Sequence, residues 1–145
     1  MVVKNEIDKL CCFYVSDFHL EMILLPYINK KMNEKIIIKT DKNLRDTIET
    51  LITKMNLSEK NKEKILKLGW NIEENEKIEN KSNIIIIGNK EYIKEENEKV
   101  RKSNIRDVTV IDCYYFEDIK EEISTIMMNY RQSLNTLGID EIESK

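Results

Sequence analysis

The stretch LCCFYVSDFHLEMILLPYINKKM, residues 10–32, contains the strand and the helix from which the fold is predicted. Leu10–Val15 is an unbroken apolar run, which is typical of a strand buried on both faces. The polar pair Ser16-Asp17 ends that run, and the segment Phe18–Met32 then has helical length and few polar residues. A helix this apolar is buried, or it covers the sheet on one side and a partner on the other.

The same order of strand and helix recurs along the chain. Three further apolar runs, Ile36–Lys39, Asn83–Ile87 and Val108–Ile111, are each followed by a helix-like stretch. Alternation of buried strands with helices indicates a parallel sheet. We therefore expect a small three-layer α/β/α domain with a four-stranded, mainly parallel sheet of Rossmann-like or RecA-like topology. The strand orders 2-1-3-4 and 3-2-1-4 both remain open, because right-handed crossovers allow either.

The remaining segments are assigned from hydrophobic spacing. The last helix is predicted over Glu117–Leu137, where apolar residues recur three or four positions apart and Gly138 follows. Residues 71–82 form a charged, solvent-exposed connection, and residues 138–145 form a frayed tail. The whole chain, residues 1–145, is therefore predicted to be a single α/β domain.

Composition excludes several classes of function. Of the 145 residues, 41% are hydrophobic, enough for a core, and the net charge of −3 leaves no broad basic field for nucleic acid or an anionic membrane. No apolar run approaches the length of a membrane span, and charged residues near the start exclude a signal-peptide core. We therefore expect a cytoplasmic protein without nucleic-acid or membrane partners.

Three cysteines lack the spacing of a metal or redox site. Cys11 and Cys12 are adjacent on the first strand, and Cys113 lies at the end of the last one. Such residues act as small buried hydrophobes in a reducing compartment. We expect no bound metal and no cofactor.

The carboxyl ends of the strands are where ligands of parallel sheets bind. Carboxylates there could bind Mg²⁺ or share a proton, but the interpretation favoured for Asp41 and Asp112 is that they cap the helices that follow or form hydrogen bonds within the loops. The aromatic cluster Tyr114–Phe116 could line a pocket, form a partner surface or pack under the last helix. The polar residues at or next to these ends are the candidate ligand-binding residues: Ser16, Asp17, His19, Asp41, Asn89, Asp112 and Tyr114.

The residues needed for nucleotide or phosphoryl chemistry are missing. The chain has three glycines, of which only Gly88 follows a strand, and the first turn offers bulky and acidic side chains to a phosphate. A response-regulator receiver would require an acidic neighbour for Asp17 and an aspartate in place of Asn89. We therefore expect neither ATP hydrolysis nor nicotinamide binding nor phospho-acceptor chemistry.

The triplet Asp17-Phe18-His19 resembles the opening Asp-x-His of calcineurin-like metallophosphoesterases, and Gly88-Asn89 resembles that family's Gly-Asn-His. Two-metal hydrolysis needs several carboxylates and imidazoles around the ions. His19 is the single histidine, and Lys90, which cannot ligate as an imidazole does, follows Asn89. An active enzyme of this type is rejected, and His19 is expected to form a hydrogen bond in the first helical turn.

The first strand ends in a turn without glycine, and MILLPYINKKMNEKIIIKTDKNLRDTIETLI follows at residues 22–52. This part of the chain resembles RecA/KaiC-like cores whose P-loop has degenerated, in particular the sensory domains called MEDS, where a buried helix with Leu-Pro precedes a short EKIIIxT strand. The resemblance covers about the first half of the chain. It implies a non-catalytic sensing or docking module, and it transfers no functional residue because the nucleotide loop is missing.

Together these observations favour a non-enzymatic regulatory, sensory or protein-interaction module on a degenerate nucleotide-binding-like α/β fold. An apolar stripe left exposed on the first or last helix would drive self-association or binding of a protein partner. The alternative is a small-molecule- or metal-binding protein, or a divergent hydrolase, which uses Asp17, His19, Asn89 and Asp112 at the strand ends.

Overall fold

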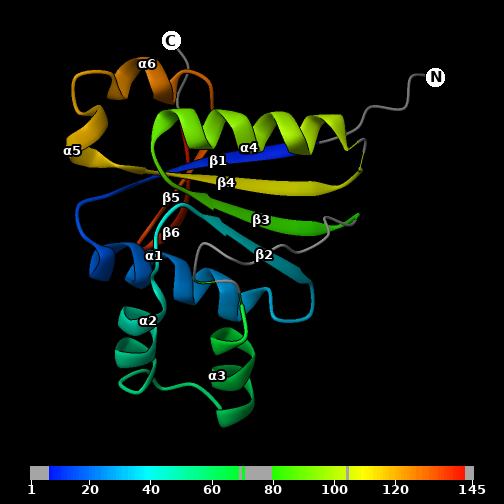
Figure 1. Cartoon of the computed structure of the whole chain (residues 1–145), viewed down its shortest axis with the longest axis vertical. Coiled ribbons are helices and arrows are strands. Elements are labelled where there is room, and N and C mark those ends of the chain that lie inside the picture. Colours follow the sequence, from blue (N-terminus) through cyan, green and yellow to red (C-terminus); the bar gives the residue numbers. More distant parts are fainter. Residues whose placement is uncertain (1–6, 69, 71–79, 104, 143–145) are drawn as a thin grey trace.

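Six strands form one sheet in the order β2-β3-β4-β1-β5-β6 within the part of the chain that the structure describes (Figure 1). This computed structural model describes residues 7–68, 70, 80–103 and 105–142. Strands β1 to β5 run parallel to their neighbours, and β6 is antiparallel to β5. The strands are β1 (Ile7–Tyr14), β2 (Lys35–Thr40), β3 (Ser82–Ile87), β4 (Val108–Tyr115), β5 (Gln132–Asn135) and β6 (Gly138–Glu141).

The general α/β class and the mainly parallel sheet are confirmed, but the predicted strand count and both predicted orders are wrong. The four expected strands have the order 2-3-4-1, and β5 and β6 extend the sheet beyond β1. Both predicted orders place β2 directly beside β1, whereas β3 and β4 separate these strands and β5 takes the other edge of β1. Strand β1 pairs with β4 over its whole length and with β5 at Leu10 and Cys11.

Helices cover both faces of the sheet in two groups. The cluster of α1, α2 and α3 packs on one face against side chains such as Cys12, Ile38 and Ile85. Helix α4 and the segment that contains α5 and α6 pack on the other face against Ile84 and Val110. The result is three layers. The helices are α1 (Asp17–Lys30), α2 (Arg45–Ile52), α3 (Glu59–Leu66), α4 (Lys90–Lys102), α5 (Phe116–Ile119) and α6 (Ile123–Met127).

Helix α1 begins where the sequence predicts. The Ser16 side chain caps it by accepting a hydrogen bond from the His19 backbone N–H at 3.1 Å. Half of its 14 residues are buried, among them Leu20, Leu24 and Ile28, and Pro26 lies within it. Its outer side leaves Met22 exposed. The first predicted helix is therefore largely buried, with one side exposed to solvent.

The long helix predicted over Glu117–Leu137 is wrong. Its first part forms α5 and α6, and its last residues form β5 and the turn that leads to β6. The apolar spacing suits two short helices, but Leu134 is buried as a strand residue beside β1. Gly138 has a φ of +118° at the start of β6, so this glycine serves the hairpin turn instead of ending a helix.

The structure also corrects parts of two segments that were predicted to be irregular, residues 138–145 and 71–82. The frayed tail predicted over 138–145 is wrong for Gly138–Glu141, which pairs with β5, while residues 143–145 lie outside the described part. In the connection predicted over 71–82, Ser82 already belongs to β3, and residues 71–79 lie outside the described part.

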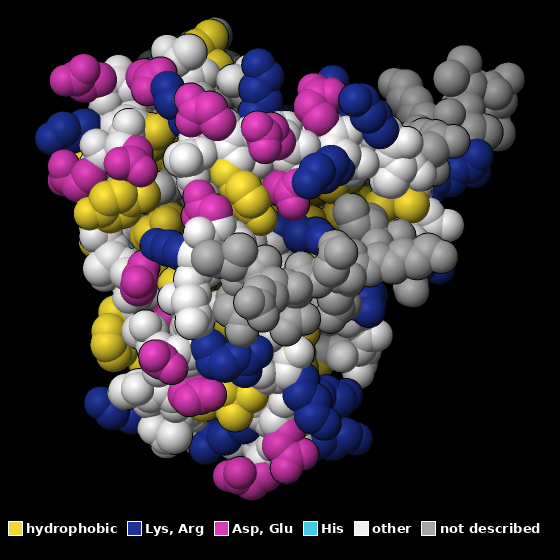
Figure 2. All heavy atoms as spheres, viewed as in Figure 1, with side chains coloured by type: hydrophobic (Ala, Val, Ile, Leu, Met, Phe, Trp, Pro, Cys, Tyr) yellow, Lys and Arg dark blue, Asp and Glu magenta, His cyan; other side chains and the backbone are white. Residues whose placement is uncertain are grey.

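The surface mixes both signs of charge. Figure 2 shows Lys and Arg side chains interspersed with Asp and Glu over the face that carries α2 and α3, with hydrophobic side chains in small groups between them. None of the described helices has the length and hydrophobicity that crossing a membrane requires.

Candidate functional site

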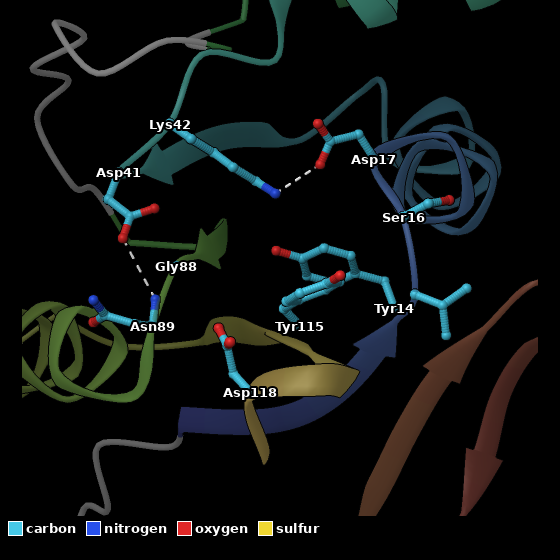
Figure 3. A pocket seen from close by; sticks show the side chains of 10 residues that line it. Tyr14, Ser16, Asp17, Asp41, Lys42, Gly88, Asn89, Tyr115 and Asp118 are labelled. Atoms are coloured by element: carbon cyan, nitrogen blue, oxygen red, sulfur yellow. Dashed lines mark hydrogen bonds and ion pairs between the residues drawn. The ribbon is translucent and has the colours of Figure 1, made fainter. Parts of the chain in front are cut away.

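A pocket of about 500 Å³ lies at the carboxyl edge of the sheet, where β1, β2, β3 and β4 end (Figure 3). Backbone segments on both sides of the strand ends form its walls, and its mouth opens to solvent. The volume is within the range of small-molecule sites. The residues that line it are Tyr14, Val15, Ser16, Asp17, Asp41, Lys42, Gly88, Asn89, Tyr115 and Asp118.

The topology explains why a pocket forms here. Strands β1 and β4 are neighbours, but the chain leaves β1 toward α1 on one face and leaves β4 toward α5 on the other. Two diverging connections leave a crevice beyond the carboxyl ends of the strands between them. This is the place in an open parallel sheet where ligands bind.

One wall of the pocket holds an ammonium group against a carboxylate and an aromatic ring. The Nζ atom of Lys42 lies 2.7 Å from Asp17 Oδ1 and 4.8 Å from the centroid of the Tyr14 ring. Burial opposes the charge on Lys42, but Asp17 and Tyr14 outweigh it and raise the pKa of the lysine. Burial raises the pKa of Tyr14. At neutral pH the wall therefore carries a protonated lysine and a neutral tyrosine.

The turns after β1 and β2 position these groups. Thr40 Oγ1 accepts a hydrogen bond from the Lys42 backbone N–H at 3.1 Å and fixes the start of the Lys42 side chain. Tyr14 and Tyr115 are paired across β1 and β4, and their ring centroids lie 5.6 Å apart at an interplanar angle of 39°. The last residues of the two central strands thus supply a floor of two tyrosine rings.

The opposite wall comes from the ends of β2 and β3. Asp41 Oδ2 accepts a hydrogen bond from the Asn89 backbone N–H at 3.4 Å, and Asn89 caps α4 through its Oδ1, which lies 2.8 Å from Tyr92 N. A Cβ atom at Gly88 would lie 2.5 Å from the Tyr92 ring and 2.9 Å from Asp41 Oδ2. Glycine is therefore required at this position for close packing. Of the two roles expected for Asp41, capping of the next helix or hydrogen bonding within a loop, the structure shows the second, since α2 has no side-chain cap.

The charged residues in the lining are mostly acidic. Asp118, the third residue of α5, turns its carboxylate toward the pocket in Figure 3. With Asp17 and Asp41 it makes three carboxylates against the single ammonium of Lys42. Among the described residues, no three His, Cys, Asp or Glu side chains are arranged to hold a metal ion.

Of the seven candidate residues from the sequence, the structure brings four into this pocket: Ser16, Asp17, Asp41 and Asn89. His19 lies just outside it in the first turn of α1. Its Nδ1 accepts a hydrogen bond from the Val15 backbone N–H at 3.0 Å. The hydrogen bond that was expected for His19 is therefore confirmed.

The placement of Asp112 at a strand end is wrong, whereas Tyr114 lies next to the end of β4 as predicted. Strand β4 continues to Tyr115, so Asp112 lies three residues before its end and points to the face covered by α4. The physical reason is that other side chains form hydrogen bonds and an ion pair with the buried Asp112 carboxylate, so the strand continues past it. Tyr114 is buried on the same face, with its Oη 2.8 Å from Tyr130 Oη.

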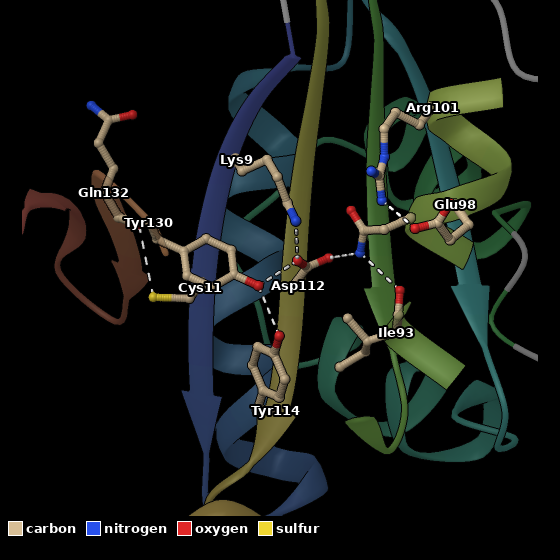
Figure 4. A network of polar contacts seen from close by, with 10 residues as sticks. Lys9, Cys11, Ile93, Glu98, Arg101, Asp112, Tyr114, Tyr130 and Gln132 are labelled. Carbon is tan, nitrogen blue, oxygen red and sulfur yellow. Dashed lines mark hydrogen bonds and ion pairs between the residues drawn. The ribbon is translucent and has the colours of Figure 1, made fainter. Parts of the chain in front are cut away.

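A network of polar contacts surrounds Asp112, which has no exposed surface (Figure 4). Its Oδ2 lies 2.5 Å from Tyr130 Oη and 3.2 Å from Lys9 Nζ, and its Oδ1 lies 2.9 Å from Asn97 Nδ2. Burial and the nearby Asp112 charge raise the pKa of Tyr130, so this hydroxyl donates. The network ties β1, β4, α4 and the segment before β5 together.

The three cysteines are buried and free. Burial raises the pKa of Cys11 to about 12 and raises the pKa of Cys113 as well. Cys11 and Cys113 are therefore protonated at neutral pH, and protonated thiols are poor nucleophiles and poor metal ligands. The cysteines therefore act as core residues, as the sequence predicts.

Glu21 is a buried carboxyl group one helical turn after Asp17. It has no exposed surface, and neither of its oxygen atoms has a hydrogen-bond partner in the described part of the chain. Burial, with a smaller contribution from Asp17, raises its pKa to about 8. At neutral pH this side chain is mostly protonated.

Six lining residues are not among the candidates from the sequence: Tyr14, Val15, Lys42, Gly88, Tyr115 and Asp118. Tyr14, Val15, Lys42 and Gly88 are at or beside the predicted strand ends, so a wider window around each end would have found them. Tyr115 belongs to the aromatic cluster that the sequence offered as a possible pocket lining, and Asp118 required knowledge of where β4 ends. Comparison with protein-family models, curated proteins and solved structures found no match, so the interpretation of the site rests on its own geometry.

Proposed function

We propose that the protein is a non-enzymatic sensory or regulatory module that binds a small molecule at the carboxyl edge of its sheet. The observation that carries this proposal is the pocket of about 500 Å³ at the divergence of the connections from β1 and β4. It combines an apolar floor of tyrosine rings with a few polar groups, which is the usual composition of a small-molecule site.

Binding without catalysis is favoured because the candidate nucleophiles of the pocket, Ser16 and Lys42, and the nearby His19 are already engaged. The Ser16 hydroxyl accepts from the His19 backbone N–H, and the Nδ1 atom of His19 accepts from a backbone N–H as well. Lys42 is held by Asp17. A nucleophile needs a free base within hydrogen-bond reach, and neither Ser16 nor Lys42 has one.

The resemblance of the first half of the chain to degenerate RecA/KaiC-like sensory domains supports the same proposal. In phosphate-binding cores, the turn between the first strand and the first helix offers free backbone N–H groups to the ligand. Here the side chains of Ser16 and His19 bind the N–H groups of that turn themselves. We therefore expect a site on this fold to bind ligands other than nucleotides.

Ligand binding is tested by the thermal unfolding of the protein with a panel of amines, carboxylates, nucleosides and aromatic compounds. A ligand at 100 times its Kd stabilises the folded state by about 2.7 kcal/mol. We expect at least one class to raise the Tm, and we expect Tyr115→Ala to abolish that rise. Asp46→Asn, on the exposed side of α2, is the matched control and keeps it.

Two results would contradict the proposal. A panel without any shift excludes a ligand site of this kind. Chemical conversion of a bound compound, followed by mass spectrometry, would make the protein an enzyme.

A second function, self-association, is favoured by exposed hydrophobic residues at the start of α1. The exposed fractions of Val15, Phe18 and Met22 are 58%, 45% and 54%. Phe18 and Met22 lie one turn apart and form a stripe that starts at the pocket mouth. Sedimentation velocity of the wild type and of Phe18→Ser/Met22→Ser tests it: we expect a concentration-dependent dimer that the double variant loses, and a strictly monomeric wild type contradicts it.

A further inference from the structure

We propose that the pocket binds an organic cation, a compound with a primary or methylated ammonium group. This inference rests on the proposed function, since it names the chemistry of the ligand for the same pocket. Three observations carry it: an ammonium group is already held in the pocket, further groups suited to a cation stand beside it, and the lining is unfavourable to anions.

The first observation is the side chain of Lys42. Its ammonium lies over the Tyr14 ring at 4.8 Å and is paired with Asp17 at 2.7 Å. A cation over an aromatic face is attracted by the ring quadrupole, and the attraction grows when the site is partly desolvated. The wall of the pocket thus already stabilises an alkylammonium group supplied by the chain itself.

The second observation is that cation-binding groups are present in excess. The Tyr115 ring lies 5.6 Å from the Tyr14 ring, but Lys42 reaches only Tyr14. The Asp118 carboxylate forms no hydrogen bond or ion pair with another described residue, and Figure 3 shows it turned toward the space beside the tyrosine rings. The Tyr115 ring and the Asp118 carboxylate are therefore available to bind the ammonium group of a ligand.

The third observation concerns anions. Three carboxylates line the pocket, Asp17, Asp41 and Asp118, and a phosphate or carboxylate ligand would meet repulsion from each of them. The single cation is neutralised by Asp17. The backbone N–H of Asn89, which could otherwise receive an anion, donates to Asp41. Charge complementarity therefore favours a cation.

The decisive probe pair is choline and its neutral isostere 3,3-dimethylbutan-1-ol, which differ in one atom and in charge. Isothermal titration calorimetry of the full chain should show binding of choline and at least tenfold weaker binding of the alcohol. Inorganic phosphate and adenosine monophosphate should not bind. Higher salt should weaken the binding of choline because the attraction is partly electrostatic.

We predict opposite changes in the affinity for choline from two substitutions in the pocket. Asp118→Asn removes a carboxylate and should weaken choline binding three- to tenfold. Lys42→Met removes the internal ammonium and frees Asp17 and Tyr14, so it should tighten choline binding by a similar factor. Asp46→Asn and Lys54→Met, both on exposed parts of the α2 segment, are the matched controls and should leave the affinity unchanged.

The outcomes separate this inference from the proposed function. If a neutral or anionic compound binds and Tyr115→Ala abolishes its binding, the pocket is a ligand site but the cation is wrong. If Lys42→Met abolishes binding of an anion, Lys42 is an anion-binding residue and the inference is overturned. If no compound of any class binds, the proposed function fails together with it. Circular dichroism of each variant confirms that the fold is retained.

Discussion

The molecule contains the same three residue types twice, once in the pocket and once inside the fold. In the pocket, Lys42 pairs with Asp17 and lies over the ring of Tyr14. On the opposite face of the sheet, Lys9 pairs with Asp112 at 3.2 Å and lies 5.2 Å from the centroid of the Tyr130 ring. The two lysine side chains are similarly exposed, at 37% and 35%, but the two carboxylates differ in burial and in the number of donors that each receives.

That difference separates a structural set from a binding set. Asp112 is fully buried and has three donors, from Tyr130, Lys9 and Asn97. The side chain of Asp17 is 45% exposed and has Lys42 as its partner at the edge of a cavity. A carboxylate whose partners are complete holds the fold together, whereas one at a cavity edge can exchange its partner for a ligand. Residue type alone would not distinguish them.

The largest expected effect is from Asp112→Ala. The substitution leaves the buried Tyr130 hydroxyl and the half-buried Asn97 amide without their acceptor, while Lys9, whose side chain is 37% exposed, can turn to solvent, so we expect a loss of about 2–5 kcal/mol in the free energy of unfolding. Urea denaturation followed by circular dichroism measures it. Tyr130→Phe, which removes one donor and no charge, should cost less, about 1–3 kcal/mol. A loss below 1 kcal/mol for Asp112→Ala would show that the network does not stabilise the fold.

The next effect concerns Glu21, which is buried like Asp112 but has no donors. Its pKa is about 8 in the folded chain and 4.5 in the reference state, so the native state holds more protons between these values. Stability therefore falls as the pH rises from about 4.5 to 8, by about 2–4 kcal/mol, and then levels off.

Glu21→Gln should remove this part of the pH dependence. Urea denaturation of the wild type and the variant at pH 5 and pH 8.5 provides the comparison. The difference in unfolding free energy between the two proteins should change over this range in favour of the variant at high pH. Parallel curves for the two proteins would mean that Glu21 is solvated in solution.

The smallest effect is expected from Asp17→Asn. The pair of Asp17 and Lys42 is partly exposed, and such pairs contribute about 0–1 kcal/mol. We expect the free energy of unfolding to change by less than 1 kcal/mol in the same urea assay. A loss comparable with that of Asp112→Ala would make the two sets equivalent and would remove the distinction between them.

The sequence predicts the sheet and one side of the pocket because local patterns determine both. The apolar runs that become β1, β2 and β3 are continuous, and polar residues end them at Ser16, Asp41 and Asn89. Side chains at those positions therefore lie at one edge of a parallel sheet, whatever the strand order. A polar residue after an apolar run therefore marks the end of a strand where that residue is exposed to solvent.

A polar residue does not mark the end of a strand where residues from distant parts of the chain form hydrogen bonds with it. Asp112 interrupts an apolar run, but Lys9, Asn97 and Tyr130 satisfy it inside the protein, and β4 continues. The C-terminal hairpin was missed for a related reason. The apolar spacing through Leu134 also fits a helix, and the pairing of β5 with β1 decides for a strand.

The position of β1 has a consequence for how the chain can fold during synthesis. Ile7 pairs with Val108, and Leu10 pairs with Gln132, so β1 is synthesised roughly 100 residues or more before the two strands that pair with it. At about 5–20 residues per second, a gap of roughly 100 residues corresponds to about 5–20 s. During that interval the apolar face of β1 has no native strand beside it. The central strand pairs of the sheet can therefore form only after β4 has been made.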